Sequence, residues 1–161
     1  MMELDPDTLT QLAWLNSEYW FRVDHPGNAE VADLYTDDGR MVFSQFRVEG
    51  NQAIRQFFGE RNASVPKRTT RHVSTNLCFD PLAEGDIRVH SIVTVYAGLG
   101  EPPLDTGIPT SVLDFTDICH FSGGNWRYRE RSGKAIFIGP GAASFLIAQL
   151  PMEHPLRTPA P

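Results

Sequence analysis

The sequence contains little cysteine and no concentration of positive charge. Only Cys78 and Cys119 among its 161 residues are cysteines, and neither stands at the spacing of a metal site. Both lie in strand-like segments, which predicts reduced thiols in the core of a cytoplasmic protein. The net charge of −6 argues against a nucleic-acid partner, because phosphate binding requires a clustered basic surface.

The sequence also has no long apolar run, and we expect no secretion signal. Residues 1–7 are acidic and lack the charged-then-apolar order of a signal peptide. No apolar run approaches the ~20 residues that span a bilayer, so we expect no membrane partner. An apolar content of 41% and a charged content of 21% are ordinary for a globular protein. We predict one domain over residues 1–150 and an extended or disordered, proline-rich tail over residues 151–161.

Helical signals dominate the first part of the chain. Asp5 followed by Pro6 predicts a helix start, and apolar residues at three- and four-residue spacing extend this helix to Val23. A short second helix is predicted from Val31 to the turn at residues 37–39.

Strand signals begin in the middle of the chain and dominate its second half. Residues 41–48 predict one or two short strands with an irregularity at residues 44–45, and Asn51 then predicts the cap of a third helix. Beyond Pro66 the hydrophobic period becomes two, and residues 122–125 are typical of a hairpin turn. The four strands predicted there span Arg71–Phe79, Ile87–Ala97, Thr110–Phe121 and Trp126–Ile138.

Helices followed by antiparallel strands predict an α+β fold in which helices cover one face of the sheet. A curved sheet around a long helix forms a cone, and the open end of a cone is a pocket. Residues 142–150 are nearly all apolar, and we expect them to cover the cone as a lid or to form a subunit contact.

Four segments occurring in this order resemble the SnoaL-like branch of the nuclear transport factor 2-like superfamily. The resemblance implies a cystatin-like cone in which three N-terminal helices pack on a curved, mainly antiparallel sheet. It does not specify the reaction, since this fold hosts dehydratases, isomerases, cyclases, dioxygenase small subunits and non-catalytic binders. The four segments are residues 32–39, 50–55, 71–76 and 124–131.

The resemblance also implies a catalytic pair. In scytalone dehydratase and hexachlorocyclohexane dehydrochlorinase, an aspartate that ends the first helix orients a histidine on the strand after the third helix. Asp24 and His72 match these two places. Ketosteroid isomerases instead carry their base on the first strand, where this chain has Phe43 or Ser44, so that mechanism is disfavoured. A carboxylate that fixes the tautomer of an imidazole makes it a general base.

The residues by themselves leave other interpretations open. Asp24 could instead cap the second helix, and His72 could make only a structural hydrogen bond. Strand alternation puts His72 on one face with Ser74, Asn76 and Cys78, and this polar face could lie either outside the sheet or in the pocket.

Further side chains are candidates for binding the substrate. The aspartates at 114 and 117 are expected to pair across strands with the arginines at 127, 129 and 131, although Arg129 could also reach the pocket as an anion stabiliser. Tyr19 and Asn76 could hold a leaving group. The predicted substrate-binding residues are Tyr19, Trp20, Phe43, Phe57, Asn76, Tyr96, Phe115 and Arg129.

These expectations describe a lyase or isomerase of the dehydratase, dehydrohalogenase or cyclase type that uses no cofactor and no metal. Its substrate would be a small apolar molecule, with cyclic compounds included. The alternative is a non-catalytic small-molecule-binding module or the small (beta) subunit of a ring-hydroxylating dioxygenase. That alternative predicts that Asp24 and His72 lie apart or that side chains fill the pocket. In either case we expect a homo-oligomer, a dimer or a trimer, because the sheet would expose one face.

Overall fold

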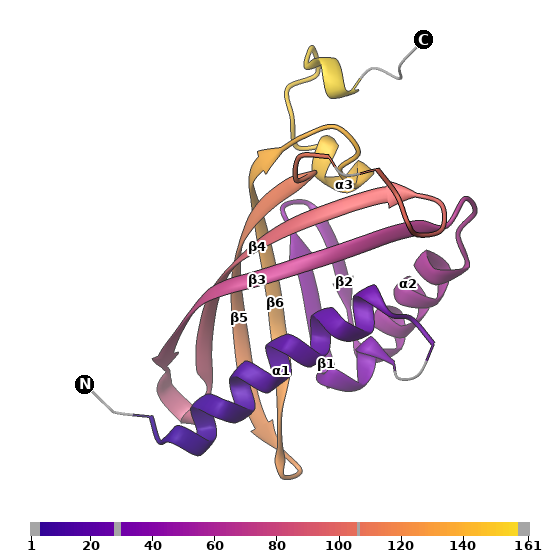
Figure 1. Ribbon diagram of the computed structural model, residues 1–161. Helices are drawn as coiled ribbons and strands as arrows, with labels where there is room; N and C mark the ends of the chain where they lie inside the picture. The colour runs from indigo at the N-terminus through magenta and orange to yellow at the C-terminus, as the bar shows by residue number, and fades with distance from the viewer. Residues whose placement is uncertain (1–3, 28–29, 106, 158–161) are drawn as a thin grey trace.

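A long helix crosses the concave face of a curved six-stranded sheet, and the space between them holds the core (Figure 1). The computed structural model describes residues 4–27, 30–105 and 107–157. The sheet has the strand order β2-β1-β6-β5-β4-β3, in which only the β1–β6 pair is parallel. This is the predicted α+β class. The elements are α1 (Pro6–Asp24), η1 (Val31–Leu34), β1 (Tyr35–Phe43), β2 (Phe46–Glu49), α2 (Asn51–Ala63), β3 (Arg68–Pro81), η2 (Ala83–Gly85), β4 (Ile87–Leu99), β5 (Ser111–Ser122), β6 (Asn125–Ile138), α3 (Ser144–Ile147) and η3 (Pro155–Arg157).

Helix α1 begins and ends close to its predicted limits. The Asp5 carboxylate accepts hydrogen bonds from the backbone N–H (2.9 Å) and the hydroxyl (2.7 Å) of Thr8, and Pro6 occupies the first turn. The helix ends at Asp24 and packs chiefly against β3. Its buried face consists of Leu12, Leu15, Asn16, Tyr19, Trp20 and Val23.

The predicted second helix begins at Val31 as expected but is shorter than predicted. Only one 3₁₀ turn, Val31–Leu34, forms, and the chain becomes extended at Tyr35. Tyr35 is buried and pairs with Tyr128 of β6, so sheet pairing overrides the weak local preference for a helix. Gly39 follows in a bulge of β1, where a Cβ atom would lie 2.9 Å from the Thr36 carbonyl oxygen.

The third predicted helix is present, but its cap is not the predicted one. Gly50, at φ +87°, is the N-cap of α2 and makes no side-chain capping bond. The Asn51 side chain instead donates a hydrogen bond to the Ala32 carbonyl at 2.6 Å, which ties the start of α2 to η1.

All four predicted strands of the second half are present, each one to three residues longer at some end. The turn between β5 and β6 has Gly123 at φ +60° and Gly124 at φ +81°, the two left-handed central positions of a type I′ hairpin.

A bulge in β3 shifts the alternation of its side chains between the two faces of the sheet. Thr75 pairs with Ile92 and Cys78 pairs with His90, so two residues of β3 stand opposite one residue of β4. Asn76 lies in this bulge at φ +57°, a conformation that asparagine tolerates better than most residues. Because the extra residue shifts the alternation, Asn76 and Cys78 are exposed. The predictions of one continuous face and of a core thiol at Cys78 are therefore wrong.

The segment after β6 returns across the open end of the cone, where Figure 1 shows α3 beside the ends of the long strands. The predicted extended tail contains one 3₁₀ turn, and the Arg157 guanidinium donates to the Leu150 carbonyl at 2.6 Å. Residues 158–161 of that tail lie outside the described part of the chain. Within the described part, no helix combines the length and the apolar character needed to cross a bilayer.

Candidate active site

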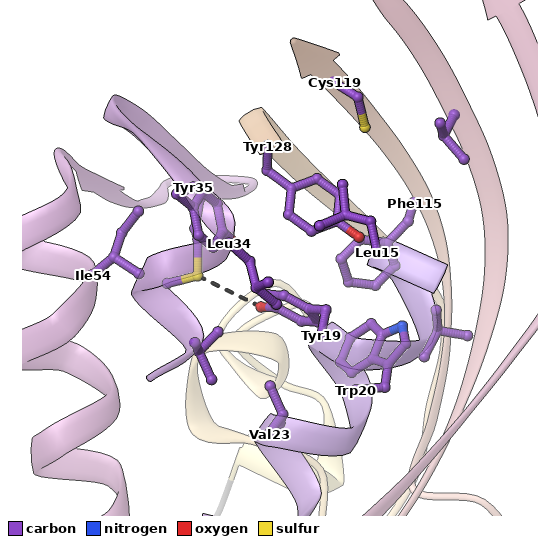
Figure 2. Close-up of a cluster of buried hydrophobic side chains, with 14 of the residues drawn as sticks. Leu15, Tyr19, Trp20, Val23, Leu34, Tyr35, Ile54, Phe115, Cys119 and Tyr128 are labelled. Carbon is purple, nitrogen blue, oxygen red and sulfur yellow. Dashed lines mark hydrogen bonds between the residues drawn. The ribbon is translucent and has the colours of Figure 1, made fainter. Parts of the chain in front are cut away.

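A cavity of about 600 Å³ lies between α1, α2, the concave face of the sheet and α3. Its size is within the range of small-molecule sites, and most of its wall is apolar. Figure 2 shows Tyr19, Trp20 and Val23 of α1 pointing toward the sheet, where Phe115 and Tyr128 lie. The aromatic residues of the cavity wall are Tyr19, Trp20, Phe43, Phe57, Phe58, Phe115 and Phe145.

Asp24 and His72 are in direct contact at the wall of this cavity. Nδ1 of His72 lies 2.7 Å from Oδ1 of Asp24, and the His72 backbone N–H donates to Oδ2 at 2.7 Å. His72 lines the cavity with a side chain 11% exposed, whereas the Asp24 side chain is 5% exposed and lies behind it. The carboxylate accepts a hydrogen bond from Nδ1–H of His72. The neutral ring therefore has its free lone pair on Nε2.

Two further side chains hold the carboxylate of Asp24. The Thr70 hydroxyl donates to Oδ1 of Asp24 at 2.8 Å and accepts a hydrogen bond from Arg61 at 3.0 Å. Arg61 also donates to the Val23 carbonyl at 3.1 Å, at the negative end of α1. Thr70 and His72 are two residues apart on β3 and therefore point to the same face. A single strand thus positions both partners of the aspartate.

The surroundings keep Asp24 ionised and His72 neutral near pH 7. Burial raises the pKa of Asp24, but the hydrogen bonds and charge of His72, with the Thr70 hydroxyl, lower it more, so the net pKa lies below 3.8. Burial lowers the pKa of His72, and the Asp24 carboxylate opposes this only in part. The positive charges of Arg61 and Arg131 add to the lowering, and the net pKa of His72 lies below 6.5.

Aromatic contacts fix the plane of the imidazole. The Trp20 ring stacks on His72 with 4.3 Å between ring centres and an interplanar angle of 16°. Trp20 is itself held edge-on by Tyr19 at 4.8 Å and by Phe115 at 5.4 Å. A base held in one orientation loses little freedom when it reacts.

A buried arginine packs against the aromatic rings of this wall. The Arg131 guanidinium lies 3.8 Å from the centre of the Tyr19 ring and 4.7 Å from that of Trp20. Its carboxylate partner is Asp117 at 3.3 Å, with both side chains inaccessible to solvent. Burial raises the pKa of Asp117 to about 7 despite the charge of Arg131. The predicted cross-strand pairing is therefore present for Asp117 and Arg131, although the sequence pattern did not indicate its burial.

Five of the eight predicted substrate-binding residues line the cavity, and three do not. Asn76 is displaced by the β3 bulge and lines a separate hollow on the opposite face of the sheet. Tyr96 is exposed on the outer face of β4. The five that line the cavity are Tyr19, Trp20, Phe43, Phe57 and Phe115.

Arg129 is excluded from the cavity by a second bulge. Tyr128 pairs with Cys119 and Glu130 pairs with Ile118, so Arg129 is the extra residue and turns outward. It binds Asp86 at 2.6 Å beside His120, away from the cavity.

Several contributors to the cavity were not predicted from the sequence, among them Arg61, Arg68 and Gly133. Arg61 follows Phe57 and Phe58 by one helical turn, so helical periodicity places all three on one face of α2. Arg68 precedes His72 by four residues, so strand alternation places both on one face of β3. Gly133 of β6 does not line the cavity itself but lies behind Phe43, which does. A Cβ atom there would overlap the Phe43 ring, so the glycine makes room for this part of the wall.

The apolar segment after β6 closes one end of the cavity. The Phe145 ring of α3 stacks on the Phe46 ring, with 5.0 Å between ring centres, and contacts the Phe43 ring, with 5.2 Å between ring centres. The Arg68 guanidinium donates to the Gly141 carbonyl at 2.6 Å, which ties this segment to β3. These contacts support the lid interpretation. The described residues contain no group of three or more His, Cys, Asp or Glu side chains placed to hold a metal.

Comparison with known proteins identifies the same architecture. The SnoaL-like domain profile matches residues 8–132. The structure is similar to ActVI-ORFA from Streptomyces coelicolor, with a TM-score of 0.70 and 14% identity over 81% of this chain and 98% of that one. It is also similar to a protein of unknown function with a cystatin-like fold from Nostoc punctiforme, with a TM-score of 0.67 and 18% identity over 83% of this chain and 95% of that one.

A type 2 hexachlorocyclohexane dehydrochlorinase shares the fold as well. Its TM-score is 0.65, with 17% identity over 85% of this chain and 90% of the other. No curated protein sequence matches the chain at a significant level. At these identities the structural likeness establishes the fold.

Proposed function

Since the chain belongs to the SnoaL-like domain family, we propose that it is a cofactor-independent lyase or isomerase of the dehydratase, dehydrohalogenase or cyclase type. Its substrate is a small, largely apolar molecule with a cyclic body, and His72 is the general base. The observation that carries the proposal is the 2.7 Å contact between Asp24 and His72 at the wall of a cavity of about 600 Å³.

In this mechanism Nε2 of His72 removes a proton from a carbon atom of the bound substrate. The C–H electron pair then forms a double bond as a leaving group departs, or relocates until the proton returns to another carbon. Asp24 keeps the Nδ1 proton in place and stabilises the imidazolium that forms. A positioned general base of this kind contributes a rate factor of about 10²–10⁴.

Two further observations support this reaction class over passive binding. The cavity is open and the acid–imidazole pair is intact, whereas a non-catalytic module predicts a filled pocket or separated partners. One protein of the same fold is named a hexachlorocyclohexane dehydrochlorinase, a name that denotes elimination from a ring.

The test is hydrogen–deuterium exchange at carbon. Bicyclic ketones and β-hydroxy ketones incubated with the protein in D₂O should take up deuterium, or eliminate water, faster than in buffer. The His72→Gln variant should lose this acceleration. The His120→Gln variant, which alters a second Asp–His pair outside the cavity, should keep it. Ligand binding without exchange by the wild-type protein would favour the binding module instead.

A further inference from the structure

Two guanidinium groups line the same cavity as His72. Arg61 belongs to α2 and Arg68 to the start of β3, and both side chains are half-buried. The rest of the wall is mainly aromatic and aliphatic. Positive charges that are withdrawn from water in an otherwise apolar pocket require a compensating group.

The hydrogen-bond partners of these arginines within the described residues carry no charge. Arg61 donates to the Val23 carbonyl, the Asn62 side chain and the Thr70 hydroxyl. Arg68 donates to the Gly141 carbonyl at 2.6 Å. A guanidinium has five N–H donors in a planar fork, so Arg68 retains donors for a second acceptor.

Within the described residues, neither guanidinium forms a direct ion pair with a carboxylate. Asp24 partly compensates Arg61, but its oxygens already accept hydrogen bonds from His72 and Thr70. Glu60 stands at the exposed rim of the cavity, where it accepts a hydrogen bond from Gln56. Moreover, Arg61 and Arg68 repel each other, and burial together with the charge of Arg61 lowers the pKa of Arg68.

We propose that the substrate is an amphipathic acid, with a cyclic apolar body in the aromatic cavity and a carboxylate bound by Arg61 and Arg68. The carboxylate gives the two guanidinium groups a directly paired negative charge and occupies the free donors of Arg68. The proposal deepens the function above because it names the substrate class of the same site, and it rests on that function only for the reaction step.

The same contact couples the acid to the lid. Arg68 already holds the Gly141 carbonyl at the start of the segment that contains Phe145. A carboxylate bound to Arg68 therefore lies beside the segment that closes the cavity, with its ring body extending toward Trp20 and His72. This orientation leaves the polar end of the substrate at the arginines and the reacting carbon near Nε2.

Binding of 2-naphthoate and of its neutral analogue 2-naphthamide, measured by isothermal titration calorimetry, tests the proposal. The wild-type protein should bind the acid about 10-fold to 100-fold more tightly than the amide, the range expected for a hydrogen-bonded charge. Arg68→Gln should remove most of this preference, because its affinity for the acid should fall much more than its affinity for the amide. Glu60→Gln should increase the affinity for the acid, because it removes the rim carboxylate.

Lys67→Gln is the matched control, because Lys67 precedes Arg68 but pairs with Glu101 outside the cavity. It should retain the preference. Equal affinity of the wild type for acid and amide, or an undiminished preference in Arg68→Gln, would overturn the proposal. The His72→Gln variant should still prefer the acid. A preserved preference with no deuterium exchange in the wild type would therefore reject the proposed reaction and leave this substrate class standing.

Discussion

Replacing Asp24 by asparagine removes the charge that orients His72 and keeps the size of the side chain. Oδ1 of Asp24 accepts hydrogen bonds from Nδ1 of His72 and from the Thr70 hydroxyl, and Oδ2 accepts one from the His72 backbone N–H. An amide has only one acceptor oxygen, so at least one of these donors would face an NH₂ group. If that donor is Nδ1, the ring must move its proton to Nε2 and can no longer act as a base toward the cavity.

The expected effect on the pKa of His72 is large. Two unit charges about 4 Å apart interact by about 4 kcal/mol at an effective dielectric constant near 20. In the wild type this attraction opposes burial and the charges of Arg61 and Arg131. We therefore expect the D24N variant to lower the pKa of His72 further, because the attraction of the carboxylate is lost. Carbon-proton exchange should slow by about 10²–10⁴-fold.

Long-range ¹H–¹⁵N NMR of histidine-labelled protein reports the tautomer and the pKa of each ring. The His72 signal is identified by its loss in the His72→Gln variant, and the wild-type ring should carry its proton on Nδ1. Asp86→Asn is the matched control, since Asp86 contacts His120 at 2.6 Å and should affect that ring alone. A D24N variant in which His72 kept the wild-type tautomer and pKa would refute the reasoning.

Three other perturbations address the stability of the site. The pKa of His72 lies below 6.5 in the folded protein, so at a pH near or below 6.5 the unfolded chain binds more protons than the folded protein does. Folding therefore becomes less favourable as the pH falls. Urea unfolding should therefore show the stability of the wild type relative to His72→Gln decreasing from pH 7.5 to pH 5, and a pH-independent difference would contradict the assignment. Asp117→Ala should cost about 3–5 kcal/mol in the same assay, because it leaves the guanidinium of Arg131 buried without its partner. A loss below about 1 kcal/mol would count against that role. Gly133→Ala should cost about 1–3 kcal/mol and weaken 2-naphthamide binding, because the added methyl group displaces the Phe43 ring. Unchanged thermal melting and calorimetry would contradict this expectation.

Local patterns predicted much of the fold. The capped start of α1, the Gly123–Gly124 hairpin and the period-two strands depend on neighbours along the chain, and each is present. The contact between Asp24 and His72 was also expected, although only the family resemblance connected two residues so far apart. Their catalytic role stays a prediction.

The failures share a physical cause. One extra residue in β3 and one in β6 invert the faces of Asn76 and Arg129, and strict alternation cannot anticipate a bulge. The short segment after Val31 contains no strong preference of its own, so pairing of Tyr35 with β6 decided its structure.

The sequence by itself determined the class of fold and most of its elements, because periodicity and caps act between close neighbours. The two residues of the candidate base came from the family resemblance. Only the tertiary structure decided which polar residues enter the cavity. Arg61 and Arg68 lie in it and Arg129 does not, because the curvature of the sheet, its bulges and the burial of distant segments choose which side chains meet.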